Sequence, residues 1–189
     1  SYACAYAPWL RANRGGEVYV PPSVAAIGTM ASSEASSELW FAPAGFNRGG
    51  LSADGAAGIA IEMATHHLTS RQRDKLYDMS VNPIASFPSN NIVVFGQKTL
   101  QSFPSALDRI NVRRLLIFVK KRVSEISRRV LFEPNVSETW KKFKDPVEQF
   151  LSSILVGGGL SEFRVVLDAT TTTPDLIDRN IMYAKVLLK

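Results

Sequence analysis

Length, composition and charge limit the classes of protein to which this chain can belong. Its 189 residues are 46% hydrophobic and 21% charged, which is typical of a globular domain and argues against wholesale disorder. A single cysteine, Cys4, excludes an internal disulfide, and no apolar run reaches the roughly 18 residues that a membrane span needs. The net charge of +5 is local: residues 107–130 hold eight Lys or Arg against two acidic residues, so the rest of the chain sums to −1.

Apolar periodicity and chain breakers predict the following elements in chain order. The first part of the chain is predicted to hold an early strand ending near Pro8, a turn and short extended piece over 13–23, a helix over 24–38 that starts at Pro21, Pro22 and Ser23, and an aromatic loop over 39–50. A short strand near 59–63, a short helix over 71–79 capped by Thr69 or Ser70, a loop over 82–89 and a strand over 91–100 follow. The last part is predicted to hold a long helix over 107–130, helices over 138–143 and 146–156, a strand over 162–168, a turn-rich loop over 169–180 and a last strand over 181–189. Strands separated by helices predict an α/β (α+β) layered fold with a mixed β-sheet and flanking helices.

Three of these predictions depend on prolines or aromatic residues. The two prolines of 82–89 favour a loop, and Pro146 favours the start of a new helix, because proline is tolerated at the first helical position and costly inside a helix. We expect the loop over 39–50 to be partly buried, since Trp40, Phe41 and Phe46 would otherwise face water. Three glycines after residue 156 indicate a helix end.

The long helix over 107–130 is predicted to be basic and amphipathic. Its apolar residues recur at spacings of three and four, giving one stripe that would pack against a sheet. The stripe consists of Val112, Leu115, Leu116, Val119, Val123, Ile126 and Val130. Asp108 is expected in the first turn, where a carboxylate favours the helix dipole. Arg109 and Arg113 lie near the same end, where cations oppose the dipole, so we expect them to reach acidic partners such as Asp178 or a neighbouring chain.

The charge of this helix has two interpretations. It can be solvated or protein-facing charge, or it can grip nucleic acid, which would require basic and amide side chains on one exposed face. The basic residues flank the apolar stripe and do not form one face, which favours the first interpretation. A nucleic-acid-binding module that uses residues 107–130 remains the alternative.

Other motifs give weak signals for chemistry. His66 and His67 are adjacent and point apart on a helix or strand, so they make a poor metal pair. Asp168, Asp175 and Asp178 lack the spacing of a calcium loop and are typical of turn hydrogen bonds. No phosphate-loop spacing and no pairing of a nucleophile with a base is present. We therefore expect no catalytic, cofactor-binding or metal-binding residues.

Six sequence words occur in a fixed order: "WFAPAGFNRG", "QRDKLYDMSVNPI", "FGQKTL", "PSALDRINVRRLL", "LFEPN" and "TPDLIDRN". With them the chain resembles the tail sheath protein of contractile-tail bacteriophages (myoviruses), a family related to the sheaths of R-type pyocins and other contractile injection systems. The resemblance runs from "YAPWL" to "YAKVLLK". It implies a structural, non-enzymatic subunit without cofactors, which polymerises around the tail tube and contracts to drive the tube through the host envelope.

The resemblance also implies partners, location and domain organisation. The partners would be other sheath subunits in hexameric rings of a helical lattice, the tail tube protein, and baseplate and tail terminator proteins, with no direct contact to nucleic acid and no membrane insertion. The location would be the virion, after assembly in the host bacterial cytoplasm. Residues 1–189 would form a single sheath core domain. Because the chain starts at Ser1 and stops within a strand, we expect an excised piece that lacks N-terminal domains and C-terminal strands.

Within the matched words, three sets of residues are candidates for structure or assembly. The expected polar framework joins the helix start to the late loop and consists of Asp108, Arg109, Asn111, Arg113, Asp178, Arg179 and Asn180. Candidate contacts to other subunits or to the tube are Lys120, Lys121, Arg122, Arg128 and Arg129. The candidate edge for strand addition, as the resemblance implies it, is Tyr183, Lys185 and Leu187.

Overall fold

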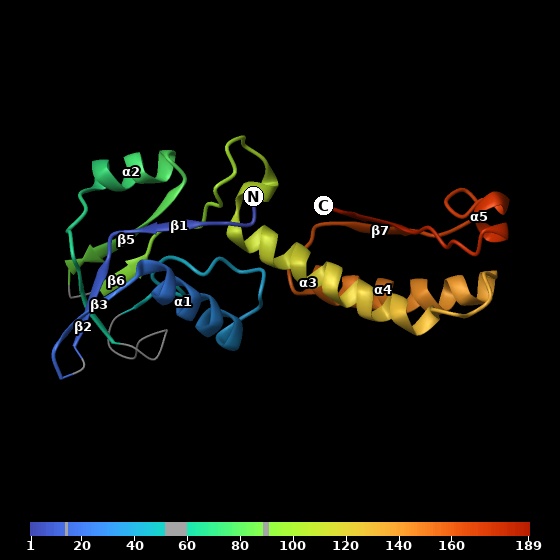
Figure 1. Ribbon diagram of the computed structural model, residues 1–189, viewed down its shortest axis with the longest axis horizontal. Coiled ribbons are helices and arrows are strands. Elements are labelled where there is room, and N and C mark those ends of the chain that lie inside the picture. Colours follow the sequence, from blue (N-terminus) through green and yellow to red (C-terminus); the bar gives the residue numbers. More distant parts are fainter. Residues whose placement is uncertain (14, 52–59, 89–90) are drawn as a thin grey trace. The chain divides into compact units, whose positions relative to one another are not determined.

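The computed structural model describes residues 1–13, 15–51, 60–88 and 91–189. The chain divides into two compact units, Ser1–Leu115 and Leu116–Lys189 (Figure 1). The sequence alone indicated no boundary near residue 115, because the long helix runs through it. Each unit has its own strands and its own buried side chains, and each is described by itself.

The first unit contains two small sheets and two covering helices. The strands are β1 (Ala5–Ala7), β2 (Leu10–Asn13), β3 (Glu17–Val20), β4 (Ile61–Ala64), β5 (Val81–Phe87) and β6 (Asn91–Val94), and the helices are α1 (Pro22–Ser36) and α2 (Ser70–Asp78). One sheet has the order β1-β5-β6, with β1 parallel and β6 antiparallel to β5; the other is antiparallel, with the order β3-β2-β4. The predicted α+β class with a mixed sheet is therefore confirmed.

The core of the first unit lies between these two sheets. Leu10 and Val20 from the antiparallel sheet meet Ile84 and Val94 from the mixed sheet, and Leu51 joins the same cluster. Burying such side chains contributes about 1.5 to 3 kcal/mol each. α1 packs beside β1, and α2 beside β5 (Figure 1).

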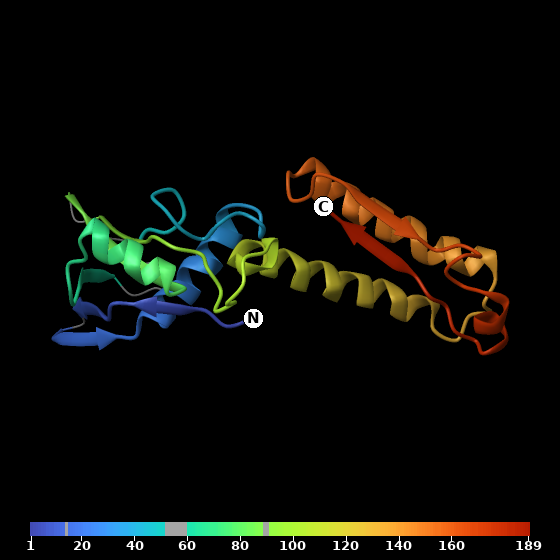
Figure 2. The ribbon, with the colours of Figure 1, turned by 90° about the horizontal axis from the view of Figure 1, so that it is seen from above.

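The second unit is built on a two-stranded antiparallel sheet. Its elements are the C-terminal part of α3 (Ile110–Ser127), the 3₁₀ turn η3 (Arg128–Val130), α4 (Ser137–Val156), β7 (Phe163–Val166), α5 (Pro174–Asp178) and β8 (Lys185–Leu188). α4 runs along β7 (Figure 2). Its buried stripe is Phe143, Val147, Leu151 and Ile154, spaced by three or four residues.

Most predicted elements are confirmed. α1 starts at Pro22, and Thr69 caps α2 in a box with Gln72, in which each side chain bonds the other residue's backbone N–H. The strands β6, β7 and β8 and the long helix α3 lie where the sequence predicted them. α4 ends at Gly157, and Gly158 takes the left-handed conformation with a φ of 74° that glycine adopts without strain.

Other predictions are wrong. Residues 82–87, predicted as a loop, belong to the central strand β5, and Pro146 lies inside one continuous helix. Asp108 belongs to a 3₁₀ turn (Ala106–Asp108) that precedes α3. Phe46, expected to be covered, is 61% exposed, and its ring makes tilted and edge-on contacts with Phe87 and Phe95 at centroid distances of 4.9 and 6.1 Å.

Two further elements were not predicted. β2 begins just after Trp9, and the short α5 lies within the turn-rich segment 169–180. The strand expected near 59–63 corresponds to β4, which begins at Ile61, and Ile59 lies outside the described residues.

Candidate assembly surface

Two arginines near the start of α3 form contacts inside the first unit. Arg114 forms an ion pair with Glu34 at 2.8 Å. Arg113 donates to the carbonyl of Leu107 at 2.7 Å and to Oε1 of Gln101 at 2.8 Å. These side chains are half-buried and have partners in their own unit. Their charge therefore serves the fold of the first unit.

The other predicted framework residues of the first unit lie close by. Arg109 forms an ion pair with Asp108, 3.1 Å between Nε and Oδ1, and donates to the hydroxyl of Tyr77. Asn111 donates to the carbonyl of Trp40 at 3.1 Å. Arg109 thus ties the helix start to α2, and Asn111 ties it to the aromatic loop.

The remaining three framework residues lie at the end of α5 in the second unit. Arg179 is 3.8 Å from the carboxylate of Asp175, one turn earlier. Asn180 takes a left-handed conformation with a φ of 56°, and its N–H donates to the carbonyl of Ile177. Asp178 is exposed on the same short helix. The predicted link between these residues and the helix start stays a prediction.

The C-terminal part of α3 and the 3₁₀ turn carry a different kind of charge. Lys120, Lys121, Arg128 and Arg129 are exposed, and none of them forms an ion pair with a described residue. Arg122 pairs with Glu125 at 3.0 Å. Exposed cations without an ion pair to a described residue are available to another molecule. Lys120, Lys121, Arg128 and Arg129, four of the five predicted contact residues, can therefore take part in such a contact.

A groove separates α3 from the last strand. It has a volume of about 390 Å³. Its lining consists of Leu116, Val119, Lys120, Val123, Ser124 and Ser127 from α3 and Val186 and Leu188 from β8. Figure 2 shows β8, in red, between α3 and the other strand. The apolar stripe predicted for the long helix therefore faces β8 across an open groove.

The free edge of β8 faces this groove. Lys189 exchanges backbone hydrogen bonds with Glu162 of the β7 side, and alternate residues of a strand direct their backbone groups to the same side. Lys185 and Leu187 therefore bond β7, while Val186 and Leu188 direct N–H and C=O away from it. Among the described strands only β7 pairs with β8. The predicted edge strand is present, but its free backbone groups belong to Val186 and Leu188 and not to the predicted Lys185 and Leu187.

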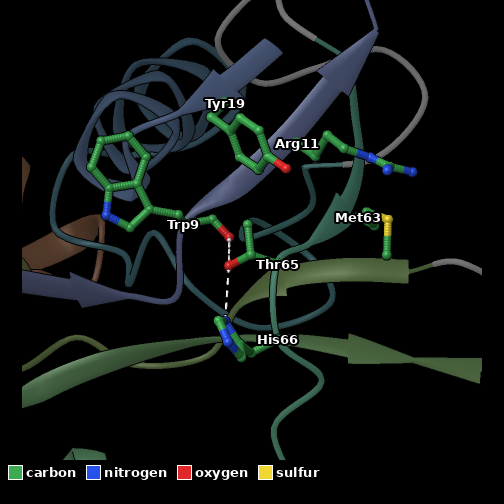
Figure 3. A pocket seen from close by; sticks show the side chains of 6 residues that line it. All are labelled: Trp9, Arg11, Tyr19, Met63, Thr65 and His66. Carbon is green, nitrogen blue, oxygen red and sulfur yellow. Dashed lines mark hydrogen bonds between the residues drawn. The ribbon is translucent and has the colours of Figure 1, made fainter. Parts of the chain in front are cut away.

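A second recess lies on the exposed face of the antiparallel sheet in the first unit (Figure 3). Trp9, Tyr19 and Met63 form its apolar part, and its volume is about 490 Å³. Arg11 beside them pairs with Glu17 at 2.6 Å. The sequence analysis missed this recess. The alternation of apolar and polar residues along β2, from Leu10 to Asn13, was the signal that could have indicated it.

Both histidines are exposed, and one of them borders this recess. The hydroxyl of Thr65 donates to the carbonyl of Trp9 at 2.9 Å and lies 3.1 Å from Nδ1 of His66 (Figure 3). Within the described ranges, no group of three or more His, Cys, Asp or Glu side chains could hold a metal ion.

Two further observations concern buried groups and membranes. Cys4 is free and half-buried, and burial, with Cys4 as a neighbour, raises the pKa of the Tyr6 phenol above its ordinary value. In the parts of the chain that the structure describes, no helix is both long and apolar enough to cross a membrane.

Solved structures define the class of protein. The sheath of an extracellular contractile injection system in its contracted state, from the PVC complex, matches 98% of this chain with a TM-score of 0.85 and 26% identity, and the match covers 51% of that chain. The helical sheath of the anti-feeding prophage in its contracted state matches the same share with a TM-score of 0.83 and 22% identity. The fold is that of contractile sheath subunits.

Sequence relatives give the family. Residues 102–189 match the phage tail sheath C-terminal domain. The tail sheath proteins of Vibrio phage KVP40 and Enterobacteria phage T4 are 37% and 38% identical over 90% and 86% of this chain. The chain belongs to the phage tail sheath family, and the resemblance found in the sequence is confirmed. The chain spans about a quarter of the length of these two relatives.

Proposed function

We propose that the protein is a structural subunit of a contractile phage tail sheath, which polymerises around the tail tube and contracts to drive it through the host envelope. The observation that carries the proposal is the match of 98% of the chain to a contracted injection-system sheath, at 26% identity. Tail sheath relatives at 37% and 38% identity support it. The role needs no catalysis, because contraction releases energy stored in a metastable packing of subunits.

The proposed partners are the other sheath subunits, in hexameric rings of a helical lattice, the tube protein, and baseplate and terminator proteins. The solved neighbours come from a sheath complex, a helical sheath and a baseplate, which supports contacts of these kinds. The proposed location is the virion, after assembly in the host cytoplasm. Residues 1–189 then act as one sheath core domain built from the two units.

We further propose that a strand from a neighbouring subunit adds to the free edge of β8. The backbone groups of Val186 and Leu188 would receive the strand. The apolar side of α3, with Leu116, Val119 and Val123, would cover it. The added strand would fill the groove and complete the packing of helix on sheet.

The test uses the complete polypeptide, electron microscopy of its assemblies and a pair of proline variants. Val186→Pro removes an N–H from the free edge, whereas Leu187→Pro removes one that bonds β7. We expect the unaltered protein to form helical tubes, and Val186→Pro to stay folded by circular dichroism without forming them. Leu187→Pro should unfold at a lower temperature than Val186→Pro. Tubes of normal length from Val186→Pro would refute strand addition at this edge.

The exposed cations Lys120, Lys121, Arg128 and Arg129 are the proposed contacts to acidic surfaces of the tube or of adjacent subunits. Interactions between exposed charges weaken as salt screens them, because the Debye length falls to about 8 Å at physiological ionic strength. The polar framework around Arg109 is proposed to hold the domain in shape. Arg109→Ala should therefore impair folding or lattice assembly.

The alternative, a nucleic-acid-binding module, is favoured by no observation. Three of the eight basic residues of 107–130 have partners inside the first unit. DNA binding would give an affinity that falls steeply with salt. We expect a flat titration with duplex DNA at low salt, and a steep salt-dependent affinity would revive the alternative.

A further inference from the structure

The turn between η3 and α4 presents apolar side chains to solvent. Phe132 is fully exposed, and Leu131 and Val136 are more than 45% exposed. Phe132 also has a φ of 68°, a left-handed backbone conformation that is a genuine outlier for a bulky residue. A fully exposed aromatic ring contributes nothing to the core of its own unit. Strain of this kind is typical of functional sites.

Ordered contacts within the second unit hold the turn in place. Asn135 donates from Nδ2 to the carbonyl of Ile181 at 3.1 Å, and its Oδ1 accepts from Nε1 of Trp140 at 2.8 Å. Glu133 forms an ion pair with Lys142 at 3.4 Å, and the N–H of Val136 donates to the carbonyl of Pro134. The aromatic ring is thus presented from a fixed base. Such preorganisation lowers the entropy cost of docking.

The charges next to the ring indicate which surface it fits. Arg128 and Arg129 precede it, are exposed and form no ion pair within the described ranges. Aromatic residues and arginine are enriched at the centres of protein interfaces, in desolvated pockets. The fitting surface is therefore an apolar recess with carboxylates at its border.

A second copy of this chain can supply such carboxylates. Outside residues 107–130 the chain has a net charge of −1. Glu38, Glu62, Asp74 and Asp145 are exposed and have no ion pair with a described residue. A protrusion that fits a different surface of an identical copy makes a head-to-tail contact, and such contacts build closed rings or open helical assemblies.

We propose that Leu131 and Phe132 form a docking element that inserts into an apolar, carboxylate-bordered recess on a second copy of this chain. The inference rests on the proposed function, because it requires that copies polymerise. It adds a contact separate from the edge of β8, made by side chains instead of backbone groups.

Photocrosslinking of the complete polypeptide identifies the partner directly. Phe132 is replaced by benzoylphenylalanine, which keeps an aromatic ring, and assembled sheaths are irradiated with tube protein present. We expect a covalent adduct of two sheath chains, far stronger than the adduct from the same probe at Val156. Val156 is 85% exposed at the end of α4 and serves as the matched control. Crosslinks only to the tube protein, to lipid or within one chain, or no crosslink at all, would overturn the proposal.

Substitutions separate assembly from stability. Phe132→Gly suits the left-handed backbone and should raise the melting temperature of the unassembled subunit, while raising the concentration needed for polymerisation at least tenfold. Phe132→Leu should assemble almost normally, and so should Val156→Ser. If the turn had only a structural role, Phe132→Gly would not raise both the melting temperature and the concentration needed for polymerisation. If the unaltered protein forms no sheath, the proposed function fails; if Phe132→Gly assembles like the unaltered protein, only this inference fails.

Discussion

The side chain of Asn82 joins three segments of the first unit through hydrogen bonds. It is completely buried, donates from Nδ2 to the carbonyls of Ala5 and Lys98 at 3.1 and 2.8 Å, and accepts from the N–H of Lys98 at 2.6 Å. It therefore links β1, β5 and the segment after β6. Gly96 leaves room for it, since a Cβ there would lie 2.8 Å from Oδ1 of Asn82.

Asn82→Ala should lower the free energy of unfolding by about 2 to 4 kcal/mol, because buried backbone groups lose their partners. Chemical denaturation measures the change. Gln149→Ala, an exposed position on α4, is the control and should stay within about 0.5 kcal/mol. Equal stabilities for the two variants would show that water replaces the amide without loss.

Asp168 predicts a pH dependence in the second unit. The hydroxyl and then the N–H of Thr170 donate to its carboxylate and hold its pKa below the ordinary value of 3.8. A carboxylate with a lowered pKa stabilises the fold above its unfolded pKa, and this contribution disappears as pH falls through the folded pKa. Asp168→Asn should therefore be less stable than the unaltered protein at pH 6, with the difference shrinking below pH 4. Urea titrations at both pH values test this, and a constant difference would contradict it.

At the scale of elements, two prolines explain where sequence reasoning failed. Pro83 lies in the central strand at the position where β1 ends, opposite Ala7, and β6 begins to pair at Ile84. Its carbonyl still accepts from the N–H of Phe95. A proline is tolerated at this position because the pairing of β5 with β1 ends there and the pairing of β5 with β6 starts at the next residue. Only the assembled sheet defines these two limits. The sequence alone therefore predicts a loop.

The second proline had a usable signal. The stripe Phe143, Val147, Leu151 and Ile154 keeps helical spacing across Pro146. Burial of this stripe outweighs the hydrogen bond that Pro146 cannot donate to the carbonyl of Lys142. The apolar spacing across Pro146 is therefore a better predictor of one continuous helix than the proline is of a break.

Pro146→Ala should make α4, and with it the second unit, more stable by about 1 to 2 kcal/mol. Proline costs about 3 kcal/mol in a helix interior, and part of the gain is offset because proline also restricts the unfolded chain. Thermal denaturation measures the effect. A lower melting temperature would mean that packing of the half-buried ring exceeds the helix penalty.

The candidate surface was predictable in part. The basic segment and the last strand were visible as patterns of charge and β-branched residues. The free groups of β8 were not, because they depend on the register with β7, and a shift of one residue exchanges the two sides of a strand. Phe132 gave no signal either, since nothing in "LFEPN" distinguishes a buried ring from an exposed one.

At the scale of the whole molecule, the two units should unfold as distinguishable transitions. Each encloses its own core, represented by the fully buried Leu10 in the first and Leu151 in the second. Leu→Ala at such sites costs about 3 to 5 kcal/mol, equivalent to shifts of roughly 10 °C or more. In calorimetry, Leu10→Ala should shift one transition and Leu151→Ala the other. A single transition shifted equally by both would show one cooperative unit.

The parallel pairing of β1 with β5 has a consequence for the order of events during synthesis. Ala5 pairs with Val81, whereas in the second unit Val165 pairs with Val186. Closing the longer loop is slower, and the ribosome delivers the N-terminus first. β1 must therefore wait, unpaired, until β5 emerges, while the hairpin of the second unit can close soon after its last residue is made. A nascent chain stalled before Val81 would expose β1 to chaperones and proteases.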